Sequence, residues 1–461
     1  MLPRATIRRR AAVLAVALLG VCGPPSYTAC RSSDGATASA PDSGAPDVVA
    51  VKPGDAAIRD AFVSDAALPP ERWERIPGLP DRCGERVARA PNEAIPPLVF
   101  APCTSGRSGC TRMMADWNRS GGIGGYEAEP MRRLASGVYF TYSRDEKPSS
   151  KTSIASLVVQ RASGERVFAI ALAPNVSGDD CVLRGAVSDY GVAVQALGIE
   201  GEYDVGVAAS PDYQSLALTK LPFSVLDPKN GGVVMEAFGS TGVAYYRNEG
   251  TSSLYDFRTK QAKTVTVDGF AWTPWGEGAL TFGSDGSSAL PTNIGYLAPD
   301  GTLTKLVDPG PGRLVAAMAV DRGVTPNQLV WIEGADAGFG LSSSEIWTGP
   351  LGTTPGAVPR RLVAKTPRGH GMLKPIAADR GRMVMLEGRS SARVVRLSDG
   401  RGWRIDAEPG EGIPDVIGFD DDNVWVSIVE DDPAFSNLGF GNGILRLRLD
   451  SLGEPSLPNG L

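Results

Sequence analysis

The sequence predicts an all-β fold, a seven-bladed β-propeller with four antiparallel strands in each blade. Short apolar segments recur along the chain, about 48 residues apart on average, with glycine-containing or acidic turns between them. Helical periodicity is almost absent, and 56 glycines and 36 prolines among 461 residues favour many turns and short strands. The recurring segments begin at Val138, Val192, Val243, Ala279, Leu329, Met383 and Val424.

The stretch 374–406 shows the complete repeat. From the inside outward, its expected strands are 375–378, 382–386, 393–397 and 402–406. Asp399-Gly400, just before the fourth strand, is a strong hairpin signal because glycine supplies the positive φ that such turns need. The stretch 313–364 repeats the pattern, with strands expected at 314–320, 328–332, 345–348 and 360–364. Four strands in 40 to 50 residues match the size of a propeller blade.

Two segments resemble the blade repeat of TolB-like and WD40-like propellers. They are 238–246, Phe-Gly-Ser-Thr-Gly-Val-Ala-Tyr-Tyr, and 251–256, Thr-Ser-Ser-Leu-Tyr-Asp. The family repeat runs from a turn and glycine through an apolar strand to a second turn, then to Leu/Ile-Tyr and Asp. Over roughly 135–450 the resemblance implies the propeller architecture. It implies no functional residue, since the family's Ser-Pro-Asp-Gly turn is absent.

Residues 1–30 have the features of a secretory signal. Arg8, Arg9 and Arg10 precede an apolar run at 11–21 that is too short to span a bilayer. Imperfect lipoboxes, the sites at which bacterial lipoproteins are cut and acylated, precede two cysteines. We expect Cys30 to be the lipidated first residue of the mature protein, with Cys22 as the alternative; cleavage without a lipid is a third reading.

Residues 31–70 are expected to form a disordered spacer. Ala, Asp, Ser, Pro and Gly fill 29 of these 40 positions. The segment therefore has too few large apolar side chains to offset the conformational entropy lost on ordering. Such a spacer behind a signal resembles surface lipoproteins of Gram-negative bacteria. The propeller is then expected over 71–461, with the segment near 98–101 pairing into the last blade to close the ring. The alternative is that 454–457 completes that blade alone.

The remaining cysteines predict two disulfides. If Cys30 begins the mature chain, four cysteines are left, an even set suited to an oxidising compartment. Only six residues separate Cys103 from Cys110, so we pair these two and expect Cys83 to pair with Cys181. Four cysteines allow three connectivities. A catalytic or metal-binding thiol is the rival interpretation, but no Cys-x-x-Cys motif occurs.

Several function classes find no support in the sequence. A single histidine, His370, argues against zinc hydrolases and haem relays. Gly-x-Ser-x-Gly and the Gly-Lys-Ser/Thr phosphate loop are both absent. A net charge of −6 gives no electrostatic basis for binding nucleic acid. We expect no cofactor.

Acidic and aromatic clusters are the remaining candidates for a site. Asp420–Asp422 and Glu430–Asp432 flank one predicted strand. We interpret the first cluster as a solvated turn, with Asp420 and Asp422 as weak calcium candidates and catalysis as a further alternative. Trp272 and Trp275 either pack between blades or form a platform for a sugar.

The sequence thus favours an exported, monomeric and lipid-anchored propeller that binds a protein or glycan without catalysis. Its only contact with the membrane would be the N-terminal lipid. The alternative is a secreted glycoside hydrolase or lyase whose carboxylates lie at the channel mouth. The sequence names no catalytic residue and no ligand.

Overall fold

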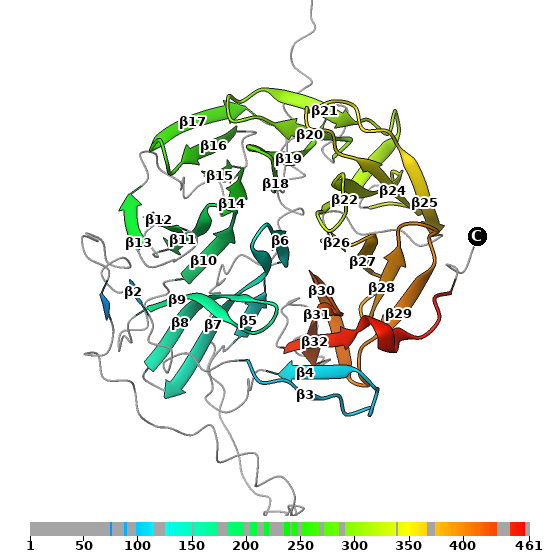
Figure 1. The fold of residues 1–461 in the computed structure, drawn as a ribbon, viewed down its shortest axis with the longest axis horizontal. Helices are drawn as coiled ribbons and strands as arrows, with labels where there is room; N and C mark the ends of the chain where they lie inside the picture. The colour runs from blue at the N-terminus through cyan, green and yellow to red at the C-terminus, as the bar shows by residue number, and fades with distance from the viewer. Residues whose placement is uncertain are drawn as a thin grey trace, which may run out of the picture. The chain divides into compact units, whose positions relative to one another are not determined.

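Each recurring apolar segment lies in a different β-sheet of the computed structural model (Figure 1). These segments belong to β7 (Gly137–Ser149), β11 (Gly191–Leu197), β15 (Gly242–Arg247), β19 (Gly278–Gly283), β23 (Gln328–Ala335), β27 (Arg382–Leu386) and β31 (Asn423–Glu430). The chain divides into two units, Met1–Ala67 and Leu68–Leu461, and all described residues belong to the second. The structure describes residues 74–75, 87–89, 98–114, 125–128, 130–149, 152–172, 182–197, 203–209, 216–220, 235–239, 242–247, 251–266, 272–284, 291–337, 340–366, 374–430 and 443–456.

Five sheets have four antiparallel strands, hydrogen-bonded in the order in which they follow along the chain. Two of them are β10 (Val182–Val187), β11, β12 (Tyr203–Ala209), β13 (Leu216–Lys220), and β14 (Met235–Phe238), β15, β16 (Thr251–Asp256), β17 (Gln261–Thr266). The other three are β18 (Trp272–Trp275), β19, β20 (Asn293–Leu297), β21 (Leu303–Val307); β22 (Arg313–Asp321), β23, β24 (Ser344–Pro350), β25 (Arg361–Thr366); and β26 (Ala377–Asp379), β27, β28 (Ser391–Arg396), β29 (Gly402–Asp406). The predicted all-β fold with four-stranded antiparallel blades is confirmed in these five sheets.

The first and last sheets are larger than the predicted blade. One contains β1 (Glu74–Arg75), β2 (Val87–Arg89), β5 (Gly125–Ala128), β6 (Arg132–Leu134), β7, β8 (Thr152–Arg161) and β9 (Arg166–Leu172). The other contains β3 (Ala101–Pro102), β4 (Cys110–Met114), β30 (Glu411–Phe419), β31 and β32 (Gly443–Arg448). The expectation that every blade has four strands is thus wrong for these two sheets: five sheets have four strands, and these have seven and five, because segments from the N-terminal side add strands to both.

Side chains from neighbouring sheets meet in shared apolar clusters. In β27 and β28, Val384 and Val394 face the last sheet, whereas Met383 and Val395 face the sheet of β22–β25. This division follows from the alternation of side chains along a strand. The innermost strands also touch in sequence, β10 with β14, β14 with β18, and β26 with both β22 and β30. Within the described residues the one helix is the 3-10 turn Leu449–Leu452. No helix in this part of the chain is long and apolar enough to cross a membrane.

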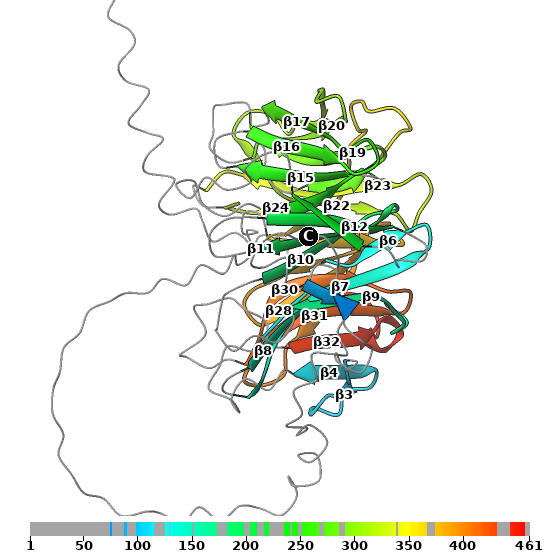
Figure 2. The ribbon, with the colours of Figure 1, turned by 90° about the vertical axis from the view of Figure 1, so that its left-hand side faces the viewer.

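The last sheet takes its outer strands from the N-terminal side of the domain. β4 pairs with β32, and β3 pairs with β4 (Figures 1 and 2). The segment near 98–101 was expected to pair into this sheet; its last residue, Ala101, does so in β3, but Cys110–Met114 is the strand that pairs with β32. Phe100 instead packs on Trp425, with ring centroids 5.4 Å apart. Of the alternative segment 454–457, Ser456 forms a bridge with Gly402 at the edge of β29.

A break in the innermost strand of the first sheet joins it to the last sheet. Between β5 and β6, the backbone N–H of Met131 donates to the carbonyl of Ile417 at 2.6 Å. Ile417 lies at an irregularity in the pairing of β30 with β31, and the next residue, Gly418, has φ of +140°. A Cβ atom on Gly418 would lie 2.9 Å from Met131 Cβ, so the close approach of the two backbones requires glycine there.

A disulfide closes the β3–β4 hairpin by joining Cys103 to Cys110, as predicted. Both cysteines are buried, and the backbone N–H of Ser105 in the enclosed loop donates to the Glu408 carboxylate at 3.0 Å. The hairpin is therefore fixed both to itself and to the segment that follows β29. Cys22, Cys30, Cys83 and Cys181 lie outside the described residues.

Replacing both Cys103 and Cys110 by serine should lower the free energy of unfolding by about 2 kcal/mol, because the short loop is no longer closed in the unfolded chain. Urea unfolding of the oxidised protein measures the difference. Ser108→Ala, in the same loop, is the control and should change the value by less than about 0.5 kcal/mol. Equal stability of the double variant and the wild type would contradict the expectation.

Candidate functional site

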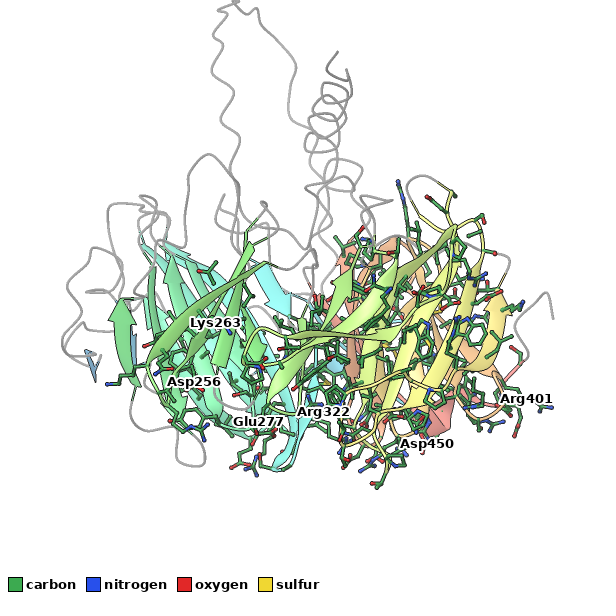
Figure 3. All side chains as sticks on the ribbon, turned by 90° about the horizontal axis from the view of Figure 1, so that it is seen from above. Asp256, Lys263, Glu277, Arg322, Arg401 and Asp450 are labelled. Atoms are coloured by element: carbon green, nitrogen blue, oxygen red, sulfur yellow. A yellow bond between two sulfur atoms is a disulfide. The ribbon has the colours of Figure 1, made fainter. Side chains whose placement is uncertain are left out.

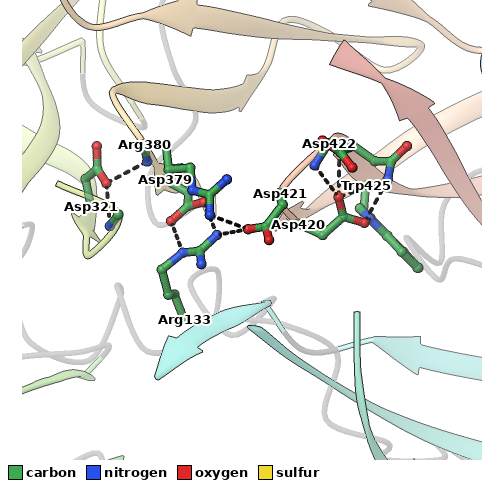
Figure 4. A network of polar contacts seen from close by, with 10 residues as sticks. Arg133, Asp321, Asp379, Arg380, Asp420, Asp421, Asp422 and Trp425 are labelled. Carbon is green, nitrogen blue, oxygen red and sulfur yellow. Dashed lines mark hydrogen bonds and ion pairs between the residues drawn. The ribbon is translucent and has the colours of Figure 1, made fainter. Parts of the chain in front are cut away.

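Aspartates mark the ends of three neighbouring innermost strands. Asp321 and Asp379 are the last residues of β22 and β26, and Asp420 directly follows β30. Because β26 contacts both β22 and β30, these strand ends lie together (Figure 4). Other turn residues, among them Glu277 and Arg322, lie along the same edge of the sheets (Figure 3).

The carboxylate of Asp420 organises the turn between β30 and β31. It accepts the backbone N–H groups of Asp422 at 2.8 Å and Asn423 at 2.6 Å, and both oxygens lie 2.9 Å from Asn423 Nδ2. Trp425 Nε1 donates to Oδ2 at 2.8 Å. Asp422 is exposed. Since N–H donors present partial positive charge to both oxygens of Asp420, this environment suits a structural turn better than a bound cation.

Asp321 reaches from its own sheet into the next one. Its carboxylate accepts the backbone N–H groups of Gly323 at 3.0 Å, Arg380 at 2.8 Å and Gly381 at 2.6 Å. Burial raises the pKa of this carboxyl, and the three backbone donors oppose the shift. Arg380 has φ of 50°, which is uncommon for a residue with a side chain. Asp321 therefore stabilises a two-residue β26–β27 turn in which both Arg380 and Gly381 have positive φ.

Arg133, on β6, connects the first sheet to the last two. Its Nε and Nη2 donate to Oδ1 and Oδ2 of Asp379 at 2.6 and 2.7 Å, the two-point geometry that makes arginine–carboxylate pairs strong. Nη2 also donates to Asp421 Oδ1 at 2.7 Å. The hydrogen bond to Asp379 is the main reason that the pKa of Arg133 is raised.

Asp421 lies between two guanidinium groups. Arg380 Nη2 is also 2.7 Å from Oδ1, so both arginines share one oxygen (Figure 4). The hydrogen bond from Arg133 and the charge of Arg380 lower the pKa of the Asp421 carboxyl. The Asp421 side chain is 58% exposed and that of Arg380 44%, against 7% for Asp379. We call Arg133, Asp321, Asp379, Arg380 and Asp421 the inner-turn network.

The network fixes positions more readily than it transfers protons. A general acid or base needs a carboxyl group whose oxygens can reach a substrate. Asp321 and Asp379 are buried and engage their oxygens with donors of the fold. Asp421 is accessible, but two guanidinium groups hold it as the anion. The arrangement can therefore bind charged groups at defined positions.

The other residues singled out in the sequence do not join this network. Trp275 is half-buried and packs edge-on against Tyr296 of its own sheet, with centroids 5.2 Å apart, at an apolar cluster shared with the sheet of β22–β25, in agreement with packing between blades. The side chains of Trp272 and Glu430 are not described, and His370, Asp431 and Asp432 lie outside the described residues. Cys103, Cys110 and Glu408 come close enough to hold a metal ion, but the two sulfur atoms are bonded to each other.

The sequence interpretation missed most of the network, although a signal for it exists. The tripeptide Asp-Arg-Gly occurs twice, at 321–323 and 379–381, each time where an innermost strand ends. Gly323 is required by packing, because a Cβ atom there would lie 2.5 Å from Arg380 Cγ. The two arginines point to different partners. Arg322 donates to the carbonyl of Pro274 on β18, whereas Arg380 pairs with Asp421.

Comparison with known proteins gives similarity in fold only. No protein-family model matches the chain, and no curated protein matches it. Among solved structures, YCF48 from Cyanidioschyzon merolae is 10% identical with a TM-score of 0.43, covering 74% of this chain and 99% of that one. A streptogramin B lyase structure is 10% identical with a TM-score of 0.39, covering 70% and 97%.

Proposed function

We propose that this chain is an exported β-propeller that acts as a non-catalytic binding module for a protein or glycan partner, with a protein favoured. The inner-turn network carries the proposal: its guanidinium and carboxylate groups are held at fixed positions by four different sheets. Preorganised charges of both signs suit recognition of charged side chains, which gives specificity more than affinity. A sugar platform would need exposed aromatic rings, and Trp275 packs on Tyr296.

The proposal includes an architecture of seven blades and a position at the cell envelope. The two larger sheets would be the first and last of the seven, joined where Met131 bonds to Ile417. Residues 1–30 would direct export, Cys30 would carry the lipid with Cys22 as the alternative, and residues 31–70 would tether the propeller. The protein would act as a monomer at the outer membrane, facing the periplasm or the cell surface, or be released.

A clickable fatty-acid analogue should label the protein in growing bacteria, and Cys30→Ala should abolish the label, because acylation occurs on the first cysteine of the mature chain. In-gel fluorescence after the click reaction measures incorporation. Cys22→Ala is the matched control and should keep the label. Loss in Cys22→Ala alone would move the lipid to Cys22, and an unlabelled wild type would remove the anchor from the proposal.

Crosslinking in intact cells followed by affinity capture tests the binding function. The tagged full chain should recover at least one protein reproducibly. A fusion of residues 1–70 to an unrelated globular protein serves as the control for proximity at the envelope. If the full chain recovers nothing beyond this control, the binding proposal fails.

The enzyme alternative requires a free carboxyl pair, and the carboxylates of Asp321, Asp379, Asp420 and Asp421 at the inner turns are engaged within the fold. On a panel of envelope and soil polysaccharides we expect no release of reducing ends or unsaturated sugars. Turnover that disappears in Asp421→Asn but not in Asp399→Asn would establish catalysis at the network and overturn the non-catalytic proposal.

A further inference from the structure

Arg133 and Arg380 bind a carboxylate that comes from an exposed turn of the same chain. Both Nη2 atoms lie 2.7 Å from Asp421 Oδ1, and the Asp421 side chain is 58% exposed. Asp421 belongs to the β30–β31 turn, whereas Arg133 is on β6 and Arg380 is in the β26–β27 turn. The carboxylate of Asp421 and the two arginines that bind it thus come from three separate elements.

The guanidinium of Arg133 and the backbone of Arg380 are held by contacts that do not involve Asp421. Two hydrogen bonds to Asp379 orient the guanidinium of Arg133. The backbone of Arg380 is held at φ of 50° by Asp321, which accepts its N–H and that of Gly381. Removing Asp421 would leave the guanidinium of Arg380 without its carboxylate partner. This guanidinium is accessible to a ligand, since the Arg380 side chain is 44% exposed.

The pairing of Asp421 with Arg380 is exchangeable, because both side chains are exposed, 58% and 44%. Ion pairs between exposed groups contribute only about 0.2–1 kcal/mol, since water and salt compete with them. An incoming carboxylate can therefore replace Asp421 with little loss, and the two arginines keep their geometric preference for a carboxylate.

We propose that Arg133 and Arg380 form a carboxylate-binding site whose resting occupant is Asp421 and whose ligand is an acidic segment of a partner protein. The inference rests on the proposed binding function and names the chemistry of its partner. Asp421 acts as a competitor within the chain, so that only a segment with more than one acidic group, or one with further contacts, displaces it efficiently. The site thereby selects against single carboxylates in solution.

Fluorescence anisotropy of a labelled, C-terminally amidated Gly-Glu-Glu-Glu-Gly peptide with the full chain tests the proposal at low ionic strength, where exposed charges are least screened. Asp421→Asn should bind the peptide about threefold more tightly than the wild type, because the internal competitor is gone. Arg380→Asn should weaken binding at least fivefold. Asparagine is chosen there because it tolerates positive φ. A second peptide, with glutamines in place of the glutamates and a free C-terminus, carries only a terminal carboxylate. Comparing the two peptides shows whether the site binds side-chain carboxylates or a terminal one.

Matched controls come from a second exposed ion pair, in the sheet of β26–β29 that also carries Arg380. Arg396 pairs with Asp399 at the β28–β29 turn, with side chains 40% and 38% exposed. Asp399→Asn and Arg396→Asn change the net charge equally but lie at another turn, so both should bind the peptide like the wild type. Thermal unfolding of each variant shows whether the fold is kept. If Arg380→Asn does not fold, Arg133→Lys takes its place in the test; it retains the charge but not the two-point geometry, and it should also weaken binding.

Equal affinities of Asp421→Asn and Asp399→Asn, or of Arg380→Asn and Arg396→Asn, would overturn the site. The cellular crosslinking experiment separates this failure from failure of the proposed function. A partner captured equally by the wild type and Arg380→Asn would leave the binding function standing and refute the carboxylate site. Capture of a partner that is lost in Arg380→Asn and kept in Arg396→Asn supports both.

Discussion

Deleting residues 98–114 should abolish the cooperative unfolding transition of the propeller. The deletion removes β3 and β4, exposes the edge of β32 and takes Met113 and Phe100 away from the apolar cluster shared by the first and last sheets. Each large buried apolar side chain contributes roughly 1.5–3 kcal/mol, and whole domains are stable by only about 5–15 kcal/mol. The loss is therefore comparable with the entire stability. Circular dichroism during heating measures the transition.

The control for this deletion is the removal of residues 456–461. In the described part of that tail, Ser456 forms a two-hydrogen-bond bridge with Gly402. Its loss should lower the midpoint by a few degrees at most. If the 98–114 deletion melts as steeply as the control and within a few degrees of it, β4 does not hold the ring together.

Replacing Trp425 by alanine should cost about 3–5 kcal/mol of unfolding free energy, as for other buried aromatic residues. Trp425 is 1% exposed and packs against Phe100 and Phe140, each with centroids 5.4 Å away. It thereby joins the first sheet to the last. Its Nε1 also donates to Asp420, so the substitution removes a donor from a buried carboxylate as well. Urea unfolding, monitored by tryptophan fluorescence and by circular dichroism, gives the loss of unfolding free energy.

Trp425→Phe separates the two contributions. The phenyl ring retains most of the packing but has no donor for Asp420, so the cost should be about 1–2 kcal/mol. A loss below about 1 kcal/mol for Trp425→Ala would show that the first and last sheets do not depend on this side chain. Equal losses for both variants would assign the effect to the hydrogen bond alone.

Strand positions followed from the sequence where local signals agree. The segments 382–386 and 402–406 were predicted to the residue, because period-two alternation and turn residues act over short distances. A glycine with positive φ lies in the turn before each strand, Gly381 before the first and Gly400 before the second. The number of four-stranded sheets was overestimated for a different reason. The sequence shows which residues can form strands, but the alignment of an N-terminal strand with the last sheet depends on partners far along the chain.

The candidate site could not be predicted because its contacts are long-range. Arg133 and Asp379 are separated by 246 residues, and no local pattern links them. Asp420–Asp422 was recognised as a turn, and in the structure Asp420 does organise that turn. The repeated Asp-Arg-Gly could have directed attention to the ends of the innermost strands. It could not have shown that one arginine reaches backward to Pro274 and the other forward to Asp421.

By itself the sequence determined that this protein is built from repeated antiparallel sheets, since alternation and turn chemistry are properties of neighbouring residues. It also predicted the Cys103–Cys110 disulfide, because the two cysteines are close in sequence. Only the tertiary structure decided which strand completes the last sheet and which charges meet at the inner turns. Both depend on how far each sheet is displaced and rotated relative to the next, and that is set by the packing of side chains from distant parts of the chain.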